Sequence, residues 1–224
     1  MPILTRAATA ALLAGLLAAC ATPAPPSRTA STDPVVLISL DGFHPDYLDP
    51  ANTPNLSRLA RDGVRAAWMN PSYPSLTFPN HYTVVTGLRP DRHGIVQNTM
   101  RDPALGDFSL RNRDAVSDGR WWGGEPIWVT AKKAGLPNAT MFWPGAEAAI
   151  GGVRPDRWQP FSYDVTIEQR VDAVVGWMRE PVATRPRITT LYFEHVDKAA
   201  HDAGPQSPEA LAAVRTLDAA IGRL

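Results

Sequence analysis

Two short runs of residues, far apart in the sequence, most constrain the fold of this 224-residue chain. Val35–Leu40 is almost continuously apolar, as a strand buried on both faces of a sheet should be, and Ile188–Phe193 is a second clear candidate. Segments with helical signals separate the two runs, which is typical of strands that run parallel. The sequence therefore predicts an α/β fold with a mostly parallel sheet covered on both faces by helices.

Local signals predict the elements between the two runs. Thr53 as N-cap, Pro54 at the first helical position and Gly63 as the stop indicate a short helix. Thr166 and Gln169 have the spacing of a capping box and predict the start of another helix. The remaining predicted elements are a helix over 125–134 and short strands over 64–69 and 139–143.

The last segment predicts a helix that starts at Ser207 and Pro208. Its apolar stripe continues to the final residue without a cap or glycine stop, through Leu211, Val214, Leu217, Ile221 and Leu224. An apolar helix face needs a covering element, so we expect the chain to be the N-terminal part of a longer protein. A complete protein with a frayed last helix is the alternative.

The first 32 residues have the pattern of an export signal and a linker. Residues 1–19 contain an apolar run that is too short to span a bilayer, as in a secretory signal peptide. Leu17-Ala-Ala-Cys20 resembles the lipobox of bacterial lipoproteins, so we expect an acylated Cys20 that anchors the exported protein on the periplasmic side of a membrane. The alternative is an ordinary cleaved signal and a periplasmic protein. Residues 20–32 are expected to form a flexible tether, and 33–224 the folded part.

The amino-acid composition excludes one class of binding partner and two kinds of cysteine-based structure. The 22 Lys and Arg residues balance 22 Asp and Glu residues, so no basic field exists to bind a nucleic-acid polymer. With 44% hydrophobic and 20% charged residues, the chain should bury a core. A single cysteine excludes an intrachain disulfide and a cysteine-based zinc cluster.

Three clusters carry residues suited to catalysis. Asp41 directly follows the first predicted strand, where open α/β sheets place their ligands, although an Asp there is more often a loop or capping residue. Thr77 lies between Pro74 and Pro79 next to a predicted helix start, or else in a plain proline turn. Asp197 and His201, four residues apart after the second strand, could hold one metal ion or form an exposed contact.

Together the clusters indicate chemistry at phosphorus. Asp41 and Asp197 both follow buried strands, so in a parallel sheet both would lie at the same edge. Threonine is a weak nucleophile until a base or metal activates it, and carboxylate and imidazole groups could hold that metal. A two-metal site stabilises both the attacking and the leaving oxygen of an in-line displacement.

Several motifs, in consistent order over about 35–224, resemble the type I phosphodiesterase/nucleotide pyrophosphatase family of the alkaline phosphatase superfamily. The longer matches are hard to obtain by chance. The motifs are Leu40-Asp-Gly-Phe43, Thr77-Phe-Pro-Asn-His-Tyr82, Thr86-Gly87, His93-Gly-Ile95 with Asn98, Trp121-Trp-Gly-Gly-Glu-Pro-Ile-Trp128, Phe142-Trp-Pro-Gly145 and Tyr192-Phe-Glu194 with Asp197 and His201.

The resemblance implies a three-layer sandwich with a central, mostly parallel sheet and two Zn²⁺ ions at the carboxyl edge of its strands. Asp41 and Thr77 would bind one zinc ion, and Asp197 and His201 the other. Thr77 would be the nucleophile that is transiently phosphorylated, and the second metal would activate the water that hydrolyses this intermediate.

The resemblance also implies roles in substrate binding. Asn98 would donate to a nonbridging phosphoryl oxygen, as in an oxyanion hole. Phe78 and Tyr192 would sandwich a nucleotide base, since every base offers an aromatic face. His81 and His93 are assigned to structure.

One departure from the family concerns the metal ligands. In the family an Asp-His pair completes the first site and a further histidine the second, all downstream of the Asp197/His201 match, and this sequence has no histidine after His201. Each site would then have two side chains, fewer than tight zinc sites use. We therefore expect the 224-residue chain alone to bind zinc weakly and to be inactive.

The function that we predict is metal-dependent hydrolysis of phosphodiester or pyrophosphate bonds in nucleotides or related small molecules, through a phosphothreonine. The alternatives are a phosphomonoesterase, sulfatase or phosphonate hydrolase of the same superfamily, or a noncatalytic surface lipoprotein. The aromatic pair Phe78 and Tyr192 favours nucleotides.

Overall fold

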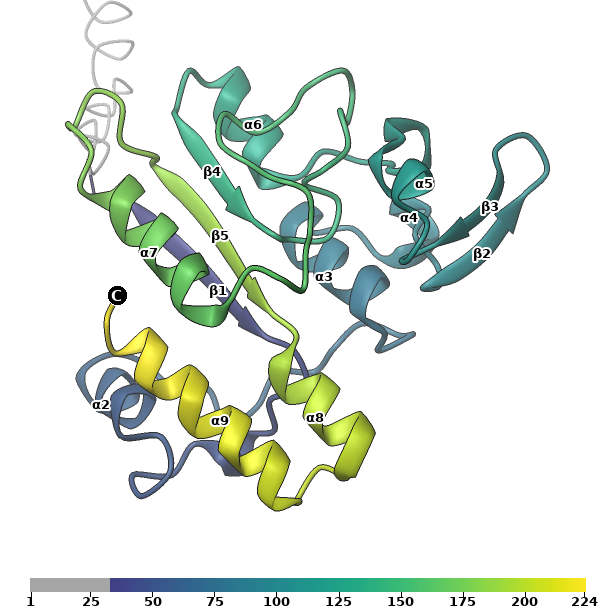
Figure 1. Cartoon of the computed structure of the whole chain (residues 1–224). Coiled ribbons are helices and arrows are strands. Elements are labelled where there is room, and N and C mark those ends of the chain that lie inside the picture. The colour runs from purple at the N-terminus through teal and green to yellow at the C-terminus, as the bar shows by residue number, and fades with distance from the viewer. Residues whose placement is uncertain (1–32) are drawn as a thin grey trace, which may run out of the picture. The chain divides into compact units, whose positions relative to one another are not determined.

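A three-stranded parallel sheet forms the centre of the computed structural model, which describes residues 33–224. The strands are β1 (Val35–Leu40), β4 (Asn138–Met141) and β5 (Ile188–Phe193), in the spatial order β1-β5-β4 (Figure 1). Val35 and Asn138 both pair with Ile188 across the two interfaces. The two apolar runs, Val35–Leu40 and Ile188–Phe193, therefore form parallel strands of one sheet, as predicted. The structure adds that they are direct neighbours. The calls on residues 1–32, including Cys20, lie outside the described residues.

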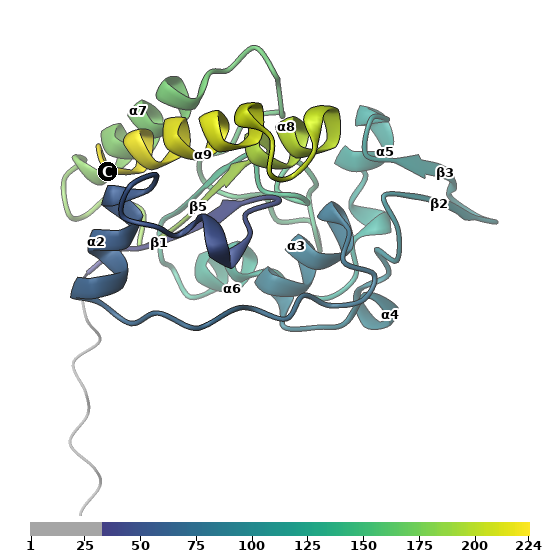
Figure 2. The ribbon, with the colours of Figure 1, turned by 90° about the horizontal axis from the view of Figure 1, so that it is seen from below.

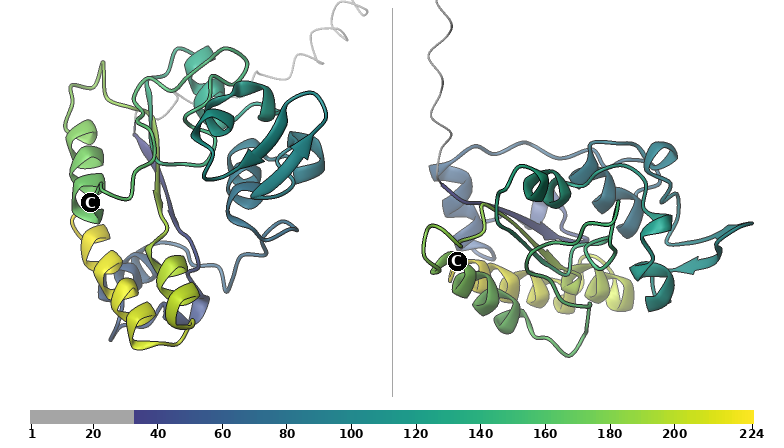
Figure 3. Two further views of the ribbon diagram at one scale, coloured as in Figure 1. Left: turned by 45° about the vertical axis from the view of Figure 1, so that its right-hand side comes forward. Right: turned by 90° about the horizontal axis from the view of Figure 1, so that it is seen from above.

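Helices cover both faces of the sheet and give three layers. Helices α7 (Ile167–Met178) and α9 (Pro208–Ile221) lie on one face, and α7 packs against β5 (Figures 2 and 3). Helices α3 (Thr77–Thr86) and α6 (Ile127–Lys133) lie on the other face. This arrangement confirms the predicted α/β sandwich.

The burial of β1 differs from the expectation. Within the described residues β1 is the edge strand, so all but one of its residues are only partly buried and Val35 is exposed. The central strand β5 is buried along nearly its whole length. An apolar run therefore marks a strand but does not say whether it lies at the centre or at the edge.

The strand expected over 64–69 is wrong. This segment belongs to a connection without regular structure, in which Val64 is fully exposed and Trp68 and Met69 are 66% and 67% exposed. No described strand lies beside these apolar residues to pair with them. Their preference for the β conformation therefore does not produce a strand. The strand expected over 139–143 exists but stops at Met141, because Phe142 adopts a left-handed backbone conformation with φ 61°.

The helix starts follow the capping signals. The capping box of Thr166 and Gln169 is complete at the start of α7, since each side chain bonds the other's backbone. Thr53 is the N-cap of α2, but its side chain bonds the carbonyls of Tyr47 and Asp49 instead of capping the helix. The other elements are η1 (Pro45–Tyr47), α2 (Pro54–Asp62), α4 (Pro90–His93), the antiparallel pair β2 (Thr99–Asp102) and β3 (Gly106–Ser109), α5 (Arg113–Ser117), η2 (Gly119–Trp121) and α8 (His195–Ala203).

The last helix ends earlier than the apolar stripe predicts. Helix α9 stops at Ile221 with Gly222 as its C-cap, and Leu224 is 43% exposed. The stripe is covered, because Val214 and Leu217 are fully buried and α9 contacts α2, α7 and α8. The helix therefore ends three residues before Leu224, the last apolar position of the predicted stripe.

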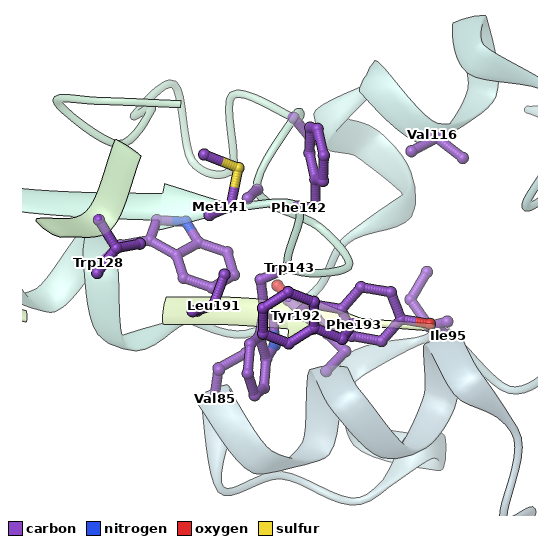
Figure 4. Packing of buried hydrophobic residues seen from close by; sticks show 14 of the residues in the cluster. Val85, Ile95, Val116, Trp128, Met141, Phe142, Trp143, Leu191, Tyr192 and Phe193 are labelled. Atoms are coloured by element: carbon purple, nitrogen blue, oxygen red, sulfur yellow. The ribbon is translucent and has the colours of Figure 1, made fainter. Parts of the chain in front are cut away.

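Large side chains fill the layers around the sheet. Trp128, Met141 and Leu191 are almost fully buried in one continuous cluster with Phe193 and Val85 (Figure 4). Within residues 33–224, no helix combines the length and apolar character needed to cross a bilayer.

Candidate active site at the carboxyl edge of the sheet

Asp41 and Asp197 lie side by side where β1 and β5 end. The amide of Asp41 donates to the carbonyl of Phe193 at 2.9 Å, and the amide of Asp197 donates to the carbonyl of Asp41 at 3.0 Å. These bonds tie the turn after β1 to the first turn of α8. The prediction that both carboxylates lie at one edge of the sheet is confirmed.

Gly42 makes this close approach sterically allowed. Its φ of 73° is left-handed, and a Cβ at this position would lie 2.7 Å from Cα and 2.8 Å from the amide nitrogen of Asp197. Any side chain would push the two chain segments apart. A glycine is therefore required directly after Asp41 for the turn after β1 to lie this close to Asp197.

Thr77 is the first residue of α3, so its hydroxyl lies at the positive end of a ten-residue helix. The Nδ1 atom of His81 donates to the carbonyl of Thr77 at 2.7 Å, and its Nε2 atom lies 2.8 Å from the hydroxyl of Ser39 on β1. His81 therefore links the threonine turn to the sheet, which agrees with the structural role assigned to it.

Asn98 lies close to the same helix start. Its side-chain oxygen accepts a hydrogen bond from the amide of Phe78 at 2.9 Å. A backbone amide can only donate, so this bond fixes the orientation of the Asn98 side chain and leaves its NH₂ group as the free donor. That donor is the group which the predicted oxyanion role requires.

Tyr192 of β5 is linked to Asp41 by a contact that the sequence did not predict. Its hydroxyl donates to Oδ2 of Asp41 at 2.8 Å, and its ring packs edge-on against His81, with ring centroids 5.0 Å apart. Burial, and then the negative charge of Asp41, raise the pKa of Tyr192 well above its ordinary value. The hydroxyl therefore stays protonated and holds Asp41 in place.

Asp197 and His201 share one face of α8, as their spacing predicts. Nε2 of His201 lies 3.5 Å from Oδ1 of Asp197. Burial, and then the negative charge of Asp41, raise the pKa of the Asp197 carboxyl, and His201 opposes this shift. Two mutually repelling carboxylates held in this way favour a cation.

A cavity of about 780 Å³ joins these residues into one site. Of the seven predicted site residues within 33–224, Asp41 alone does not line it, although it is hydrogen-bonded to two residues that do, Tyr192 and Asp197. Phe78 packs against Trp122 and Phe108, so its ring is fixed at the cavity wall. The predicted residues in the lining are Thr77, Phe78, Asn98, Tyr192, Asp197 and His201.

The donor types suit zinc, but they are few. Carboxylate and imidazole groups are zinc ligands in proteins, and the raised pKa of Asp197 beside Asp41 marks a position that a cation would stabilise. In the described part of the chain, however, no three His, Cys, Asp or Glu side chains are grouped to hold one metal. The described residues therefore offer donor groups of the kinds that zinc prefers, but they do not form a complete coordination shell for a metal ion.

Sequence reasoning missed several residues of the cavity wall. Arg113 and Glu147 form an ion pair there, and Glu147 also accepts from the amide of Phe161 at 3.2 Å. Glu194, directly after β5, lines the cavity and is paired with the buried Arg170. A signal for Arg170 exists in the sequence, because it falls on the apolar stripe of α7, three residues after Ile167. The ion pair of Arg113 and Glu147 has no such signal.

The layered parallel sheet, with its cavity at the carboxyl edge of the strands, places the chain among the alkaline phosphatase-like α/β proteins. Residues 35–224 match the sequence profile of the type I phosphodiesterase / nucleotide pyrophosphatase family. The chain belongs to this family.

Individual relatives agree with this assignment. Human ectonucleotide pyrophosphatase/phosphodiesterase family member 1 is 42% identical over 86% of this chain and 21% of its own length. An uncharacterised pyrophosphatase/phosphodiesterase of Schizosaccharomyces pombe is 43% identical over 85% of this chain and 40% of its own length. The solved structure of an inactive threonine-to-alanine variant of murine ectonucleotide pyrophosphatase/phosphodiesterase 5, in complex with AMP, superposes with a TM-score of 0.79 at 34% identity. The match covers 85% of this chain and 51% of the murine chain. This chain therefore spans between about a fifth and about half of the length of these three relatives.

Proposed function

We propose that this protein hydrolyses phosphodiester or pyrophosphate bonds in nucleotides, with Thr77 as the nucleophile. The observation that carries the proposal is the meeting of Thr77, Asn98, Asp197 and His201 in one cavity of a chain that belongs to this family. A single hydroxyl at a helix start would be weak support. A hydroxyl beside carboxylate, imidazole and amide groups is a constellation suited to acyl or phosphoryl transfer.

In the proposed reaction the Thr77 oxygen attacks phosphorus and the bond to the leaving oxygen breaks, which gives a phosphothreonine. Water then attacks this phosphorus and releases the threonine oxygen. The N-terminus of α3 and the free NH₂ group of Asn98 are suited to stabilise negative charge on the phosphoryl oxygens. The helix start and the Asn98 side chain are both fixed before substrate arrives. The Phe78 amide donates a hydrogen bond to the Asn98 side-chain oxygen, and the His81 ring donates one to the Thr77 carbonyl.

Zinc is the metal that we propose for this site. Asp41 and Thr77 would bind one ion and Asp197 and His201 the other, together with ligands from outside residues 33–224. Bound zinc would lower the pKa of the threonine hydroxyl and of water, and would neutralise phosphoryl charge. Tyr192 supports this role of Asp41 because its hydroxyl fixes the carboxylate orientation.

A nucleotide is the substrate class that we favour. The solved murine relative holds AMP, and in this chain Phe78 and Tyr192 line the same cavity as Thr77. The cavity, at about 780 Å³, lies within the range of small-molecule sites and has room for a nucleotide. Aromatic faces accept all bases, so we expect little discrimination between bases by Phe78 and Tyr192 alone.

The test compares hydrolysis of bis-(4-nitrophenyl) phosphate and 4-nitrophenyl phosphate by the protein expressed from its complete gene. We expect a preference for the diester and a loss of at least about a thousandfold in Thr77→Ala, the scale on which loss of a nucleophile acts. Thr86→Ala makes the same change at the other end of α3, where the hydroxyl bonds the Tyr82 carbonyl, and should keep the activity.

The outcomes separate the alternatives. A preference for the monoester favours a phosphomonoesterase of the same superfamily. Full activity in Thr77→Ala would refute the assignment of the nucleophile. Absence of any hydrolysis by the zinc-loaded protein would favour a noncatalytic lipoprotein.

We further propose that the protein is exported and anchored to a membrane through an acyl chain on Cys20. This rests on the Leu-Ala-Ala-Cys motif and the preceding apolar run. We expect Cys20→Ser to move the protein from the membrane fraction to the soluble periplasmic fraction, measured by immunoblot of separated fractions. An unchanged distribution would support an ordinary cleaved signal.

A further inference from the structure

Arg170 is a fully buried cation on the core-facing side of α7. Its neighbours on the helix stripe, Ile167, Val171 and Val174, are buried apolar residues. A charge in such surroundings is costly unless it is paired and its N–H groups are bonded. The position therefore needs a specific reason for an arginine.

Its hydrogen bonds are directed at the end of β5. Nη1 donates to Oε2 of Glu194 at 2.6 Å and to the carbonyl of Tyr192 at 3.2 Å, and Nη2 donates to Oε1 of Glu194 at 2.9 Å. Nε donates to the carbonyl of Val165 at 3.1 Å. Four of the five N–H donors of Arg170 are thus used. The two parallel hydrogen bonds from Nη1 and Nη2 form a bidentate fork that fixes both carboxylate oxygens of Glu194.

The face of the guanidinium group covers aromatic rings of the cavity wall. Its central carbon lies 4.7 Å from the ring centre of Phe142 and 5.7 Å from that of Phe161. Phe142 has the left-handed φ of 61°, which a bulky residue keeps only where its surroundings hold it. The cation over its ring is one such support.

Four of these five partners line the cavity, namely Phe142, Phe161, Tyr192 and Glu194, whereas Val165 and Arg170 itself do not. The Glu194 carbonyl also accepts the amide of Lys198 at 2.9 Å, in the first turn of the helix that carries Asp197. Arg170 therefore joins the aromatic wall of the cavity to the corner where β5 turns into α8.

We propose that Arg170 is a positioning residue that sets nucleotide affinity by fixing this wall, with Tyr192 and Glu194 as the residues through which it acts. The inference rests on the proposed nucleotide site and names a residue that does not touch the substrate. A residue needed only for folding would change the fraction of active protein, which lowers apparent kcat at constant KM. A positioning residue raises KM and weakens AMP binding in the folded protein.

Arg170→Lys keeps the charge but loses the fork and the planar face. Arg157→Lys is the matched control, because Arg157 also forks onto a carboxylate, that of Glu180, and bonds the Thr184 carbonyl at 3.0 Å, away from the cavity. In the protein from the complete gene we expect Arg170→Lys to raise KM for a nucleotide diester and Kd for AMP by about tenfold, because small displacements of positioning groups have such effects. Arg157→Lys should lower Tm without changing either constant.

Glu194→Gln provides a second variant in case Arg170→Lys does not fold. It removes the charge without changing size and keeps one oxygen for the arginine, so we expect a smaller increase in Kd for AMP. Wild-type KM and Kd in every folded variant would overturn the inference and leave the proposed function intact. A wild-type protein that neither hydrolyses diesters nor binds AMP would overturn the proposed function, and this inference with it.

Discussion

Gly42 sets the distance between the chain segments that carry Asp41 and Asp197. A methyl group there would meet the backbone of Asp197 at 2.7 Å, and the φ of 73° is unfavourable for any residue with a side chain. We expect Gly42→Ala to lower the free energy of unfolding by about 1–2 kcal/mol for the left-handed backbone and by about 1–3 kcal/mol more for the clash. Urea unfolding of this chain measures the sum.

Gly135→Ala separates the two effects. Gly135 has a φ of 70°, and a Cβ there would meet nothing within 4 Å. Only the backbone cost should appear, so this variant should be more stable than Gly42→Ala. Equal losses in the two variants would mean that the segments move apart without cost.

The Tyr192 hydroxyl holds the Asp41 carboxylate through a hydrogen bond of 2.8 Å. Tyr192→Phe keeps the ring and its contact with His81 but removes the donor to Asp41. We expect kcat of the complete protein to fall by about tenfold, corresponding to about 1.4 kcal/mol, with little change in KM. Steady-state kinetics on a nucleotide diester measure both constants.

Tyr163→Phe is the control for this change. Tyr163 also lines the cavity, but its side chain is 70% exposed. It should leave kcat unchanged. A larger effect on KM than on kcat in Tyr192→Phe would indicate that the hydroxyl contacts substrate instead of positioning Asp41.

At the scale of elements, α9 supplies the N-terminal cap of α2. The buried carboxylate of Asp218 accepts from the amides of Asn55 at 3.2 Å and Leu56 at 2.8 Å, and from the Asn55 side chain at 3.0 Å. It takes the place of Thr53, whose hydroxyl makes no capping bond. We expect Asp218→Ala to cost about 1.5–3 kcal/mol, the range for hydrogen bonds to a charged group.

Urea unfolding of this chain measures that loss, with Glu209→Ala as the control. Glu209 is an exposed carboxylate on the same helix, so its removal should change stability by about 0.5 kcal/mol or less. If Asp218→Ala matched Glu209→Ala, α2 would draw its stability from elsewhere.

The observed helices and strands show which sequence signals are sufficient to predict a secondary-structure element. Capping residues located the start of α7 and α9, because these bonds form between residues three apart and need no tertiary partner. The apolar residues of 64–69 did not form a strand, because a strand needs a neighbour to pair with and the described sheet provides none there.

At the scale of the whole molecule, the number of metal ligands decides what this chain can do alone. Residues 33–224 group no three suitable side chains around one metal position. We expect the 224-residue chain to retain less than one zinc ion per molecule after gel filtration and to be inactive on diesters, because tight zinc sites use three or four protein ligands. Elemental analysis measures the retained zinc.

His201→Ala in the same chain is the control, since it removes one of the ligands that we propose. It should lower the retained zinc further. Two tightly held zinc ions in the 224-residue chain would contradict the prediction and would mean that two side chains for each ion are enough here.

The sequence by itself determined the α/β class, the two apolar strands β1 and β5 of a parallel sheet and the residues of the candidate site, because strand patterns and short motifs are local in the chain. The tertiary structure decided which strand is central, how Tyr192 and Asp41 are joined, and that Arg170 and Glu194 support the cavity wall. It also decided that Asp218 caps α2. These contacts join residues 24 to 163 positions apart, and no local preference specifies which of many polar groups will meet across such distances.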